Sequence, residues 1–183
     1  EIPQTHFVGI SMGGAVAQQV ALDAPERIAS LTLIDTTAGY DDADAKVFRQ
    51  RATQARERGM KALADGTLER WLGERFRKRH PEASERVRAL VAKAHPEGFA
   101  AACEALAAFD VRAKLSEIDA PTLVLVGEND PSTPPAVARR IASGIAGARL
   151  EIVPDAAHLS IVEQKQFVTN ALATFLLGAS SNV

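Results

Sequence analysis

Apolar residues along this chain are arranged in two ways, as short continuous runs and as stripes with helical spacing. The short runs are bounded by turn-forming residues, which is typical of buried strands. Four runs predict strands, at Thr5–Val8, Leu31–Ile34, Thr122–Val126 and Leu150–Val153. Helical patterns follow them, at Ala15–Ala24, Pro135–Gly144 and Ile161–Leu177. Because strands alternate with helices, we expect an α/β fold with a mostly parallel sheet.

The first predicted helix also indicates which of its faces is buried. Val16, Val20 and the alanines near them are expected to pack inward. Pro25 cannot continue a helix and therefore marks its end. At the other end of the chain, residues 179–183 are polar and are expected to form a loose tail.

Between Asp41 and Phe109 the chain has helical periodicity and no convincing strand. Helices are expected at Ala43–Arg58, Met60–Arg79, Glu82–Ala94 and Pro96–Ala108. Breaks are predicted at Gly59, Pro81 and Pro96, with a further one near Gly66. The sequence thus predicts an α/β core made of residues 1–38 and 110–183, with a helical cap, residues 39–109, inserted between two strands.

Composition indicates one globular core and excludes several functions. The 183 residues are 46% hydrophobic and 24% charged, and their net charge of −2 offers no basic surface for nucleic acid. The stretch 41–109 carries 14 Lys or Arg against 11 Asp or Glu, a net +3 that leaves −5 for the remainder. Most of the charges in this basic insert are expected to form a solvated outer face.

Membrane insertion and disulfide bonding are not expected either. No apolar run approaches the length of a spanning helix, and Glu1–Gln4 lacks the regions of a signal peptide. Cys103 is the one cysteine, so no internal disulfide can form and a cytoplasmic location is expected. We expect Cys103 to be a small buried residue on an alanine-rich helix.

The segment around Ser11 has the pattern Gly9-x-Ser11-x-Gly13, placed after a strand and before a helix. This arrangement is typical of a nucleophile elbow, a tight turn that lifts a serine hydroxyl above the sheet. A side chain at Gly9 or Gly13 is expected to clash because strand and helix pass close together. The amide N–H of Met12, at the start of the helix, is expected to stabilise an oxyanion.

A serine nucleophile requires a base, and one histidine stands in the expected place. Functional groups of parallel sheets gather at the carboxyl ends of strands, and His158 follows the last predicted strand there. His6 precedes its strand and lies at the wrong end. His80 and His95 adjoin prolines at helix ends, where capping or exposure is expected. His158 is therefore the predicted base.

Three aspartates compete to orient that base. Asp130 lies just past the carboxyl end of the strand Thr122–Val126, which favours it, although aspartate at such a turn also stabilises its own backbone. Asp35 ends the preceding strand and is the main alternative. Asp155 lies on the loop of the histidine and is the weaker alternative.

These residues and several longer segments resemble the α/β-hydrolases, most closely the 3-oxoadipate enol-lactonases. The segments are Gly9–Gly14, Ala24–Ile28, Leu68–Trp71, Gly98–Cys103 and Ala156–Gln164. The resemblance implies a triad of Ser11, Asp130 and His158, a helical cap, no cofactor and no metal. It also implies a small lactone or ester substrate, with no nucleic acid or membrane partner, and Trp71 could line the pocket for it.

Other functions fit the same residues. A carboxylesterase or a C–C bond hydrolase would keep the triad and differ in its cap. A non-catalytic interaction module with this fold would not need Ser11 at all.

The resemblance begins at the nucleophile strand, whereas the family has further strands before it. That part also donates a second oxyanion N–H, so we expect the isolated 183 residues to be inactive. Without it, Thr5–Val8 would form an exposed apolar edge. A separate N-terminal fragment or another copy of the chain is the partner that this expectation suggests.

Overall fold

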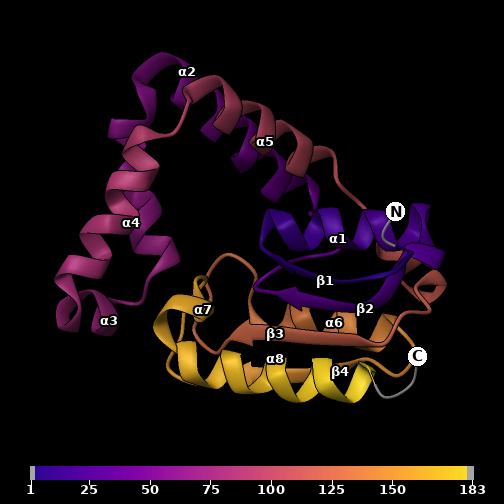
Figure 1. Cartoon of the computed structure of the whole chain (residues 1–183). Coiled ribbons are helices and arrows are strands. Elements are labelled where there is room, and N and C mark those ends of the chain that lie inside the picture. The colour runs from indigo at the N-terminus through magenta and orange to yellow at the C-terminus, as the bar shows by residue number, and fades with distance from the viewer. Residues whose placement is uncertain (1–2, 181–183) are drawn as a thin grey trace. The chain divides into compact units, whose positions relative to one another are not determined.

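The computed structural model describes residues 3–180, which divide into two compact units (Figure 1). The first unit contains the residues up to Ala38 and those from Val111 onward. The second unit is Gly39–Asp110. The chain crosses between them at neighbouring points, where Val111 N–H donates to the Ala38 carbonyl at 2.7 Å. Each unit is described by itself below.

A parallel sheet forms the centre of the first unit. Its strands are β1 (Thr5–Ile10), β2 (Ile28–Ile34), β3 (Thr122–Gly127) and β4 (Arg149–Val153), in the order β1-β2-β3-β4. Every pair is parallel, which confirms the predicted fold class. β2 starts before the predicted Leu31 because a 3₁₀ turn, Pro25–Arg27, leads directly into it.

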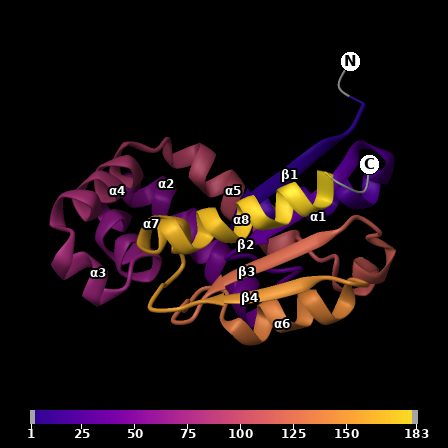
Figure 2. The same ribbon diagram turned by 60° about the horizontal axis from the view of Figure 1, so that its bottom comes forward.

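Helices cover both faces of this sheet. They are α1 (Met12–Asp23), α6 (Pro135–Gly144), α7 (Ser160–Glu163) and α8 (Lys165–Ser180). α8 packs on Ile34, Leu123 and Leu125, and it lies in front of the sheet in Figure 2 with α6 behind. The helix predicted at Ile161–Leu177 is thus two helices, separated at Gln164.

The predicted inward face of α1 is wrong in one respect. Val16 is 49% exposed, and the buried positions of this helix are held instead by small residues and one amide. Ala17 and Gln18 are fully buried, and Gln18 donates to the carbonyls of Gly14 and Thr37 at 3.1 and 2.9 Å. α1 packs closely at this face, where a Cβ on Gly14 would lie 2.6 Å from the Thr36 Cβ.

β1 occupies one end of the strand order, so within residues 3–180 it pairs with β2 alone. Val8 on this strand is 44% exposed. The exposed apolar edge expected from the sequence is therefore present. Nearby, Val8 and Ile10 line a cavity of about 340 Å³ together with side chains of α8.

The second unit is entirely helical apart from an isolated bridge between Gly39 and Asp110. Its helices are α2 (Asp42–Trp71), α3 (Glu74–Arg79), α4 (Pro81–Lys93) and α5 (Pro96–Ala108). Asp41 caps α2 by accepting from the Asp44 N–H at 2.9 Å, and prolines begin α4 and α5.

Gly59 has φ 72° and ψ 167°, which kinks α2 at a predicted break. The break predicted near Gly66 is wrong, because α2 continues to Trp71 and ends at the fully buried Leu72. A glycine inside a helix lowers its stability without ending it.

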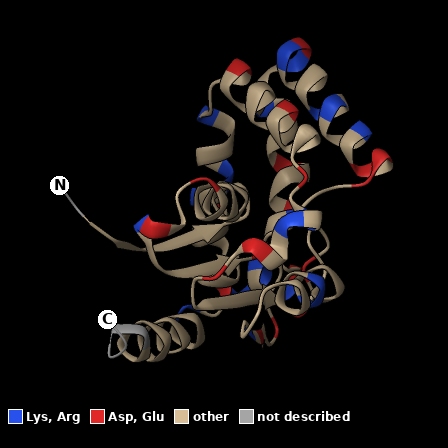
Figure 3. Cartoon of the chain, turned by 90° about the vertical axis from the view of Figure 1, so that its right-hand side faces the viewer, with Lys and Arg blue, Asp and Glu red and all other residues tan. Residues whose placement is uncertain are grey.

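Small side chains and ion pairs hold these helices together. Ala52, Ala100 and Cys103 form one buried cluster, and burial raises the pKa of the Cys103 thiol to about 11, as expected for a structural cysteine. On the surface, Arg56 pairs with Glu97 and Glu104. Figure 3 shows Lys and Arg interspersed with Asp and Glu on these helices. Among the helices formed by residues 3–180, none is long and apolar enough to cross a membrane.

Candidate active site

Ser11 lies in a strained turn between β1 and α1. Its φ of 50° and ψ of −116° lie in a region that residues with side chains rarely adopt, at a cost of roughly 1–3 kcal/mol. Two hydrogen bonds fix the turn, one with β2 and one with the segment after it. Ser11 N–H donates to the Ile34 carbonyl at 2.9 Å, and the Thr36 hydroxyl donates to the Ser11 carbonyl at 2.7 Å.

The glycines around Ser11 differ in how much space surrounds them. A Cβ on Gly9 would lie 2.2 Å from the Gly13 carbonyl oxygen, so the predicted clash is confirmed there. The clash predicted at Gly13 is wrong, because a Cβ there would meet nothing within 4 Å outside its own turn of helix. Gly14 is the second crowded position, where a Cβ would lie 2.6 Å from the Thr36 Cβ. Gly14 therefore packs against Thr36 in the segment after β2, whereas Gly13 has open space around it.

His158 forms hydrogen bonds with both Ser11 and Asp130. His158 Nε2 is 2.9 Å from Ser11 Oγ, and His158 Nδ1 is 2.8 Å from Asp130 Oδ2. A carboxylate at Nδ1 holds the proton on that nitrogen, which leaves Nε2 able to accept from the serine hydroxyl. The structure therefore brings together the three residues predicted as nucleophile, base and acid.

The loop that carries His158 follows β4 and is held by hydrogen bonds at the two residues before the histidine. Ala157 N–H donates to Glu163 Oε1 at 2.8 Å, and Asn129 N–H donates to the Ala156 carbonyl at 2.8 Å. The second bond ties the histidine loop to the turn that carries Asp130. Base and acid are thus positioned by one connected piece of backbone at the carboxyl ends of β3 and β4.

Asp130 is buried, and its carboxylate accepts several hydrogen bonds. Its Oδ1 accepts from the N–H groups of Ser132 and Thr133 at 2.7 and 3.1 Å, and its Oδ2 accepts from the Thr133 hydroxyl at 2.7 Å. Burial raises the pKa of Asp130, but the hydrogen bond and charge of His158 and the bonds from Thr133 outweigh it, so the pKa is lowered overall. Asp130 is therefore held as a carboxylate.

The hydrogen bonds of Asp35 go to other residues than His158. Its Oδ1 accepts from Gly127 N–H at 2.9 Å, and its Oδ2 accepts from the N–H and the hydroxyl of Ser160 at 3.0 and 2.7 Å. Burial raises its pKa to about 6 despite these bonds. Asp35 thus links the end of β3, just before Asp130, to the start of α7, just after His158.

The sequence predicts Asp35 only as an alternative partner of the histidine and does not indicate the link that it makes between two loops. Its positive φ of 47° is not visible in the sequence, and its contacts are distant along the chain. Asp155, the other alternative, has its own N–H bonded to Glu128 at 3.1 Å and is exposed.

The remaining histidines have structural partners. His6 Nδ1 is 2.8 Å from Ser30 Oγ, and His95 accepts from Gly98 N–H at the start of α5. His80 lies between α3 and α4, with its ring 4.5 Å from that of Phe76. Across residues 3–180, His, Cys, Asp and Glu form no group of three or more that could hold a metal ion.

Met12 and Trp71, the predicted oxyanion donor and pocket residue, have different surroundings. Met12 is the first residue of α1, and its N–H makes no hydrogen bond to another described residue, so it can donate to an oxyanion beside Ser11. Trp71 packs against the apolar cluster of the second unit that contains Met60 and Val91. This contact gives Trp71 a structural role, and its contact with substrate stays a prediction.

Comparison with known proteins identifies the family. The family model described as the alpha/beta hydrolase fold matches residues 1–165. The chain belongs to this family. It is 37% identical over 172 residues to 3-oxoadipate enol-lactonase 2 of Acinetobacter baylyi, an alignment that covers 94% of the chain and 63% of that relative. The chain thus spans less than two thirds of the relative's length.

Two solved α/β-hydrolase structures are also similar. The enol-lactonase from Burkholderia xenovorans LB400 matches with a TM-score of 0.92 and 35% identity, over 96% of this chain and 66% of its own. A thermophilic esterase from Thermogutta terrifontis matches with a TM-score of 0.91 and 34% identity, over 97% of this chain and 66% of its own. Both structures are of hydrolytic enzymes, which agrees with the family assignment.

Proposed function

We propose that this α/β-hydrolase chain carries the nucleophile, base and acid of a serine hydrolase that opens enol-lactones or related esters. One observation carries the proposal. Ser11 Oγ, both ring nitrogens of His158 and the Asp130 carboxylate form a continuous hydrogen-bonded sequence with separations of 2.9 and 2.8 Å. A strained serine with this relay is the arrangement that activates a hydroxyl for attack on a carbonyl.

In the proposed reaction, Ser11 Oγ attacks the lactone carbonyl while His158 Nε2 takes the hydroxyl proton. Asp130 stabilises the charged imidazole, and the Met12 N–H donates to the oxyanion. The C–O bond of the ring then breaks, and His158 returns the proton to the leaving enolate. The resulting enol becomes a ketone, so return to the lactone is unfavourable. Water activated by His158 then releases the acid and frees Ser11.

The substrate class rests on the relatives. The enol-lactonases of Acinetobacter baylyi and Burkholderia xenovorans support an enol-lactone such as that of 3-oxoadipate. The similar esterase of Thermogutta terrifontis supports a simpler ester as the second candidate. A C–C bond hydrolase or a non-catalytic module would use the same fold, but nothing in the geometry of Ser11 favours either.

A fluorophosphonate probe tests the catalytic part of the proposal. In the whole protein, the probe is expected to add covalently to Ser11, located by mass spectrometry of the digested protein, and Ser11→Ala is the control that should remain unlabelled. Failure to label Ser11 in a folded sample would favour the non-catalytic module.

Hydrolysis of 3-oxoadipate enol-lactone and of p-nitrophenyl acetate then tests the substrate. A larger kcat/KM for the lactone supports an enol-lactonase, and the reverse supports an esterase. The same assay on residues 1–183 alone tests whether this chain is inactive without a further segment. Turnover comparable with the whole protein would overturn that expectation.

A further inference from the structure

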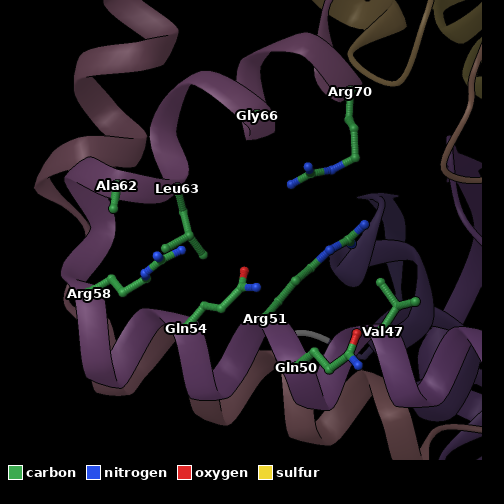
Figure 4. A pocket seen from close by; sticks show the side chains of 9 residues that line it. All are labelled: Val47, Gln50, Arg51, Gln54, Arg58, Ala62, Leu63, Gly66 and Arg70. Atoms are coloured by element: carbon green, nitrogen blue, oxygen red, sulfur yellow. The ribbon is translucent and has the colours of Figure 1, made fainter.

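The second unit contains a cavity of about 250 Å³ that lies between two parts of one helix. Nine side chains line it, and Figure 4 shows them projecting from both parts of α2. They are Val47, Gln50, Arg51, Gln54, Arg58, Ala62, Leu63, Gly66 and Arg70. The cavity lies wholly within this unit and shares no residue with the site around Ser11.

The kink at Gly59 is what makes the cavity possible. Residues before it, from Val47 to Arg58, recur at helical spacing and share one face, as do those after it from Ala62 to Arg70. Because α2 is kinked at Gly59, both faces line the same cavity (Figure 4). The φ of 72° and ψ of 167° at Gly59 belong to a conformation that is essentially restricted to glycine.

Three arginines line this cavity and no acidic residue does. Figure 4 shows the side chains of Arg51 and Arg70 reaching toward each other across the opening. Both are half-buried, whereas Arg58 is exposed. Neither Arg51 nor Arg70 makes an ion pair in the described part of the chain, in contrast with Arg56 and Arg88 of the same unit.

Both guanidinium groups are fixed in place without a counter-ion. Arg51 lies over the ring of Phe48, with Cζ 5.1 Å from the ring centroid, and Arg70 donates to the Thr67 hydroxyl at 3.1 Å. Burial and then the charge of Arg51 lower the pKa of Arg70, while Glu69 acts more weakly in the opposite direction. Two positive charges are thus held together where an anion would relieve their repulsion.

The rest of the lining adds neutral donors and apolar contacts. The side-chain amides of Gln50 and Gln54 make no hydrogen bond to other residues between 3 and 180, so their N–H groups are available. Figure 4 shows Val47 and Leu63 at the sides of the same opening. An inorganic oxyanion would use only the polar groups, whereas an organic acid would also contact these apolar walls.

We propose that this cavity binds the carboxylate of a small organic acid, held by the guanidinium groups of Arg51 and Arg70. The planar fork of an arginine matches the two oxygens of a carboxylate, and such charge-assisted bonds are about twice as strong as neutral ones. Gln50 and Gln54 supply further donors. This site does not depend on the proposed reaction, because it requires nothing from Ser11.

Isothermal titration calorimetry of the folded protein with adipate tests the site. Adipamide is the uncharged control of matched length, and inorganic phosphate is the control without an apolar part. Adipate is expected to bind and adipamide is not. Arg51→Gln and Arg70→Gln should each weaken adipate binding by at least about tenfold, which is the loss expected for one charge-assisted hydrogen bond.

Arg49→Gln is the matched charge control, because Arg49 is exposed on the same part of α2 and lies outside the cavity. It should leave adipate binding unchanged. Equal affinity in Arg51→Gln, Arg70→Gln and the parent protein would overturn the proposal, as would equal binding of adipamide or an absence of adipate binding. Phosphate binding as tight as that of adipate would overturn the assignment to an organic acid.

Nuclear magnetic resonance gives a readout that does not need a variant to fold. Adipate should shift the side-chain amide signals of Gln50 and Gln54 in the parent protein, and unshifted signals would contradict the site. The same titration of Ser11→Ala should give the same affinity. Loss of Ser11 labelling with adipate binding retained would overturn the proposed function and leave this site standing.

Discussion

Two buried carboxylates at the carboxyl ends of neighbouring strands, Asp35 and Asp130, have opposite electrostatic surroundings. Asp130 faces a histidine and several donors, so its pKa is lowered, whereas burial raises that of Asp35 to about 6. The first is suited to stabilise a developing imidazolium, and the second joins two loops through neutral donors. Residue type and position in the sequence were alike for both, so only their partners separate the two roles.

Asp130→Asn is expected to reduce kcat by on the order of 10⁴-fold, because an amide cannot hold the proton of His158 on Nδ1 and stabilise its charge. Steady-state hydrolysis by the whole protein measures the effect. Asp155→Asn is the matched control, since Asp155 is an exposed aspartate on the histidine's own loop and should keep its activity. Similar losses in both variants would contradict the assignment of Asp130 as the acid.

Position in the chain predicted Ser11, His158 and Asp130, because each follows a strand at its carboxyl end. The bonds of Asp35 could not be predicted in this way. They join residues that lie 92 and 125 positions apart, and they depend on a backbone conformation at Asp35 that no local pattern indicates. Such contacts are determined by how the strands and loops pack together and not by the local sequence.

At the scale of elements, the close packing of α1 on the segment after β2 depends on Gly14 rather than on Gly13. Gly14→Ala is expected to destabilise the chain by roughly 1–3 kcal/mol, because its Cβ would lie 2.6 Å from the Thr36 Cβ. Gly13→Ala should instead raise stability by up to about 1 kcal/mol, since it meets nothing and alanine favours a helix. Urea unfolding of both variants measures this difference, and equal destabilisation would contradict it.

The two glycines of α2 should also respond differently to alanine. Gly59→Ala forces a side chain into a conformation that favours glycine and is expected to cost roughly 1–3 kcal/mol and to weaken adipate binding. Gly66→Ala should stabilise the helix by about 1 kcal/mol, because its Cβ would meet only Arg70 Nη1 at an ordinary 3.6 Å. Thermal unfolding compares them, and a stable Gly59→Ala with unchanged adipate affinity would refute the role of the kink.

Elements were predictable where the pattern was strong and local. The strand run Thr122–Val126 and the helix Pro135–Gly144 are observed almost as predicted. The break predicted near Gly66 is wrong because α2 continues through this residue of low helix propensity, with Ala64 and Thr67 buried on either side of it. The burial predicted for Val16 is wrong because periodicity indicates which residues of a helix are apolar but not which of them the sheet covers.

For the whole molecule, buried carboxylates make the free energy of unfolding depend on pH in two separate ranges. Asp130 has a lowered pKa, so the stability it contributes is present above the ordinary carboxyl range and is lost as pH falls through its folded value. Asp35 has a raised pKa and acts in the opposite sense. Its folded form holds a proton that the unfolded chain has released, so its contribution is fully present below pH 3.8 and is lost as pH rises to about 6.

In the parent protein, the titration of Asp35 should lower the free energy of unfolding by up to about 3 kcal/mol as pH rises from 4 to 6. Asp35→Asn should abolish this decrease. The variant will also be less stable at every pH, because an amide cannot accept from both Gly127 and Ser160 as the carboxylate does. The slope of unfolding free energy against pH, from urea titrations, separates the two effects, and Asp155→Asn controls for the loss of one charge. An unchanged slope in Asp35→Asn would mean that Asp35 titrates as an ordinary carboxyl. A flattened slope with Ser11 labelling retained would show that Asp35 supports the loops of the acid and the base without taking part in the proton transfer between them.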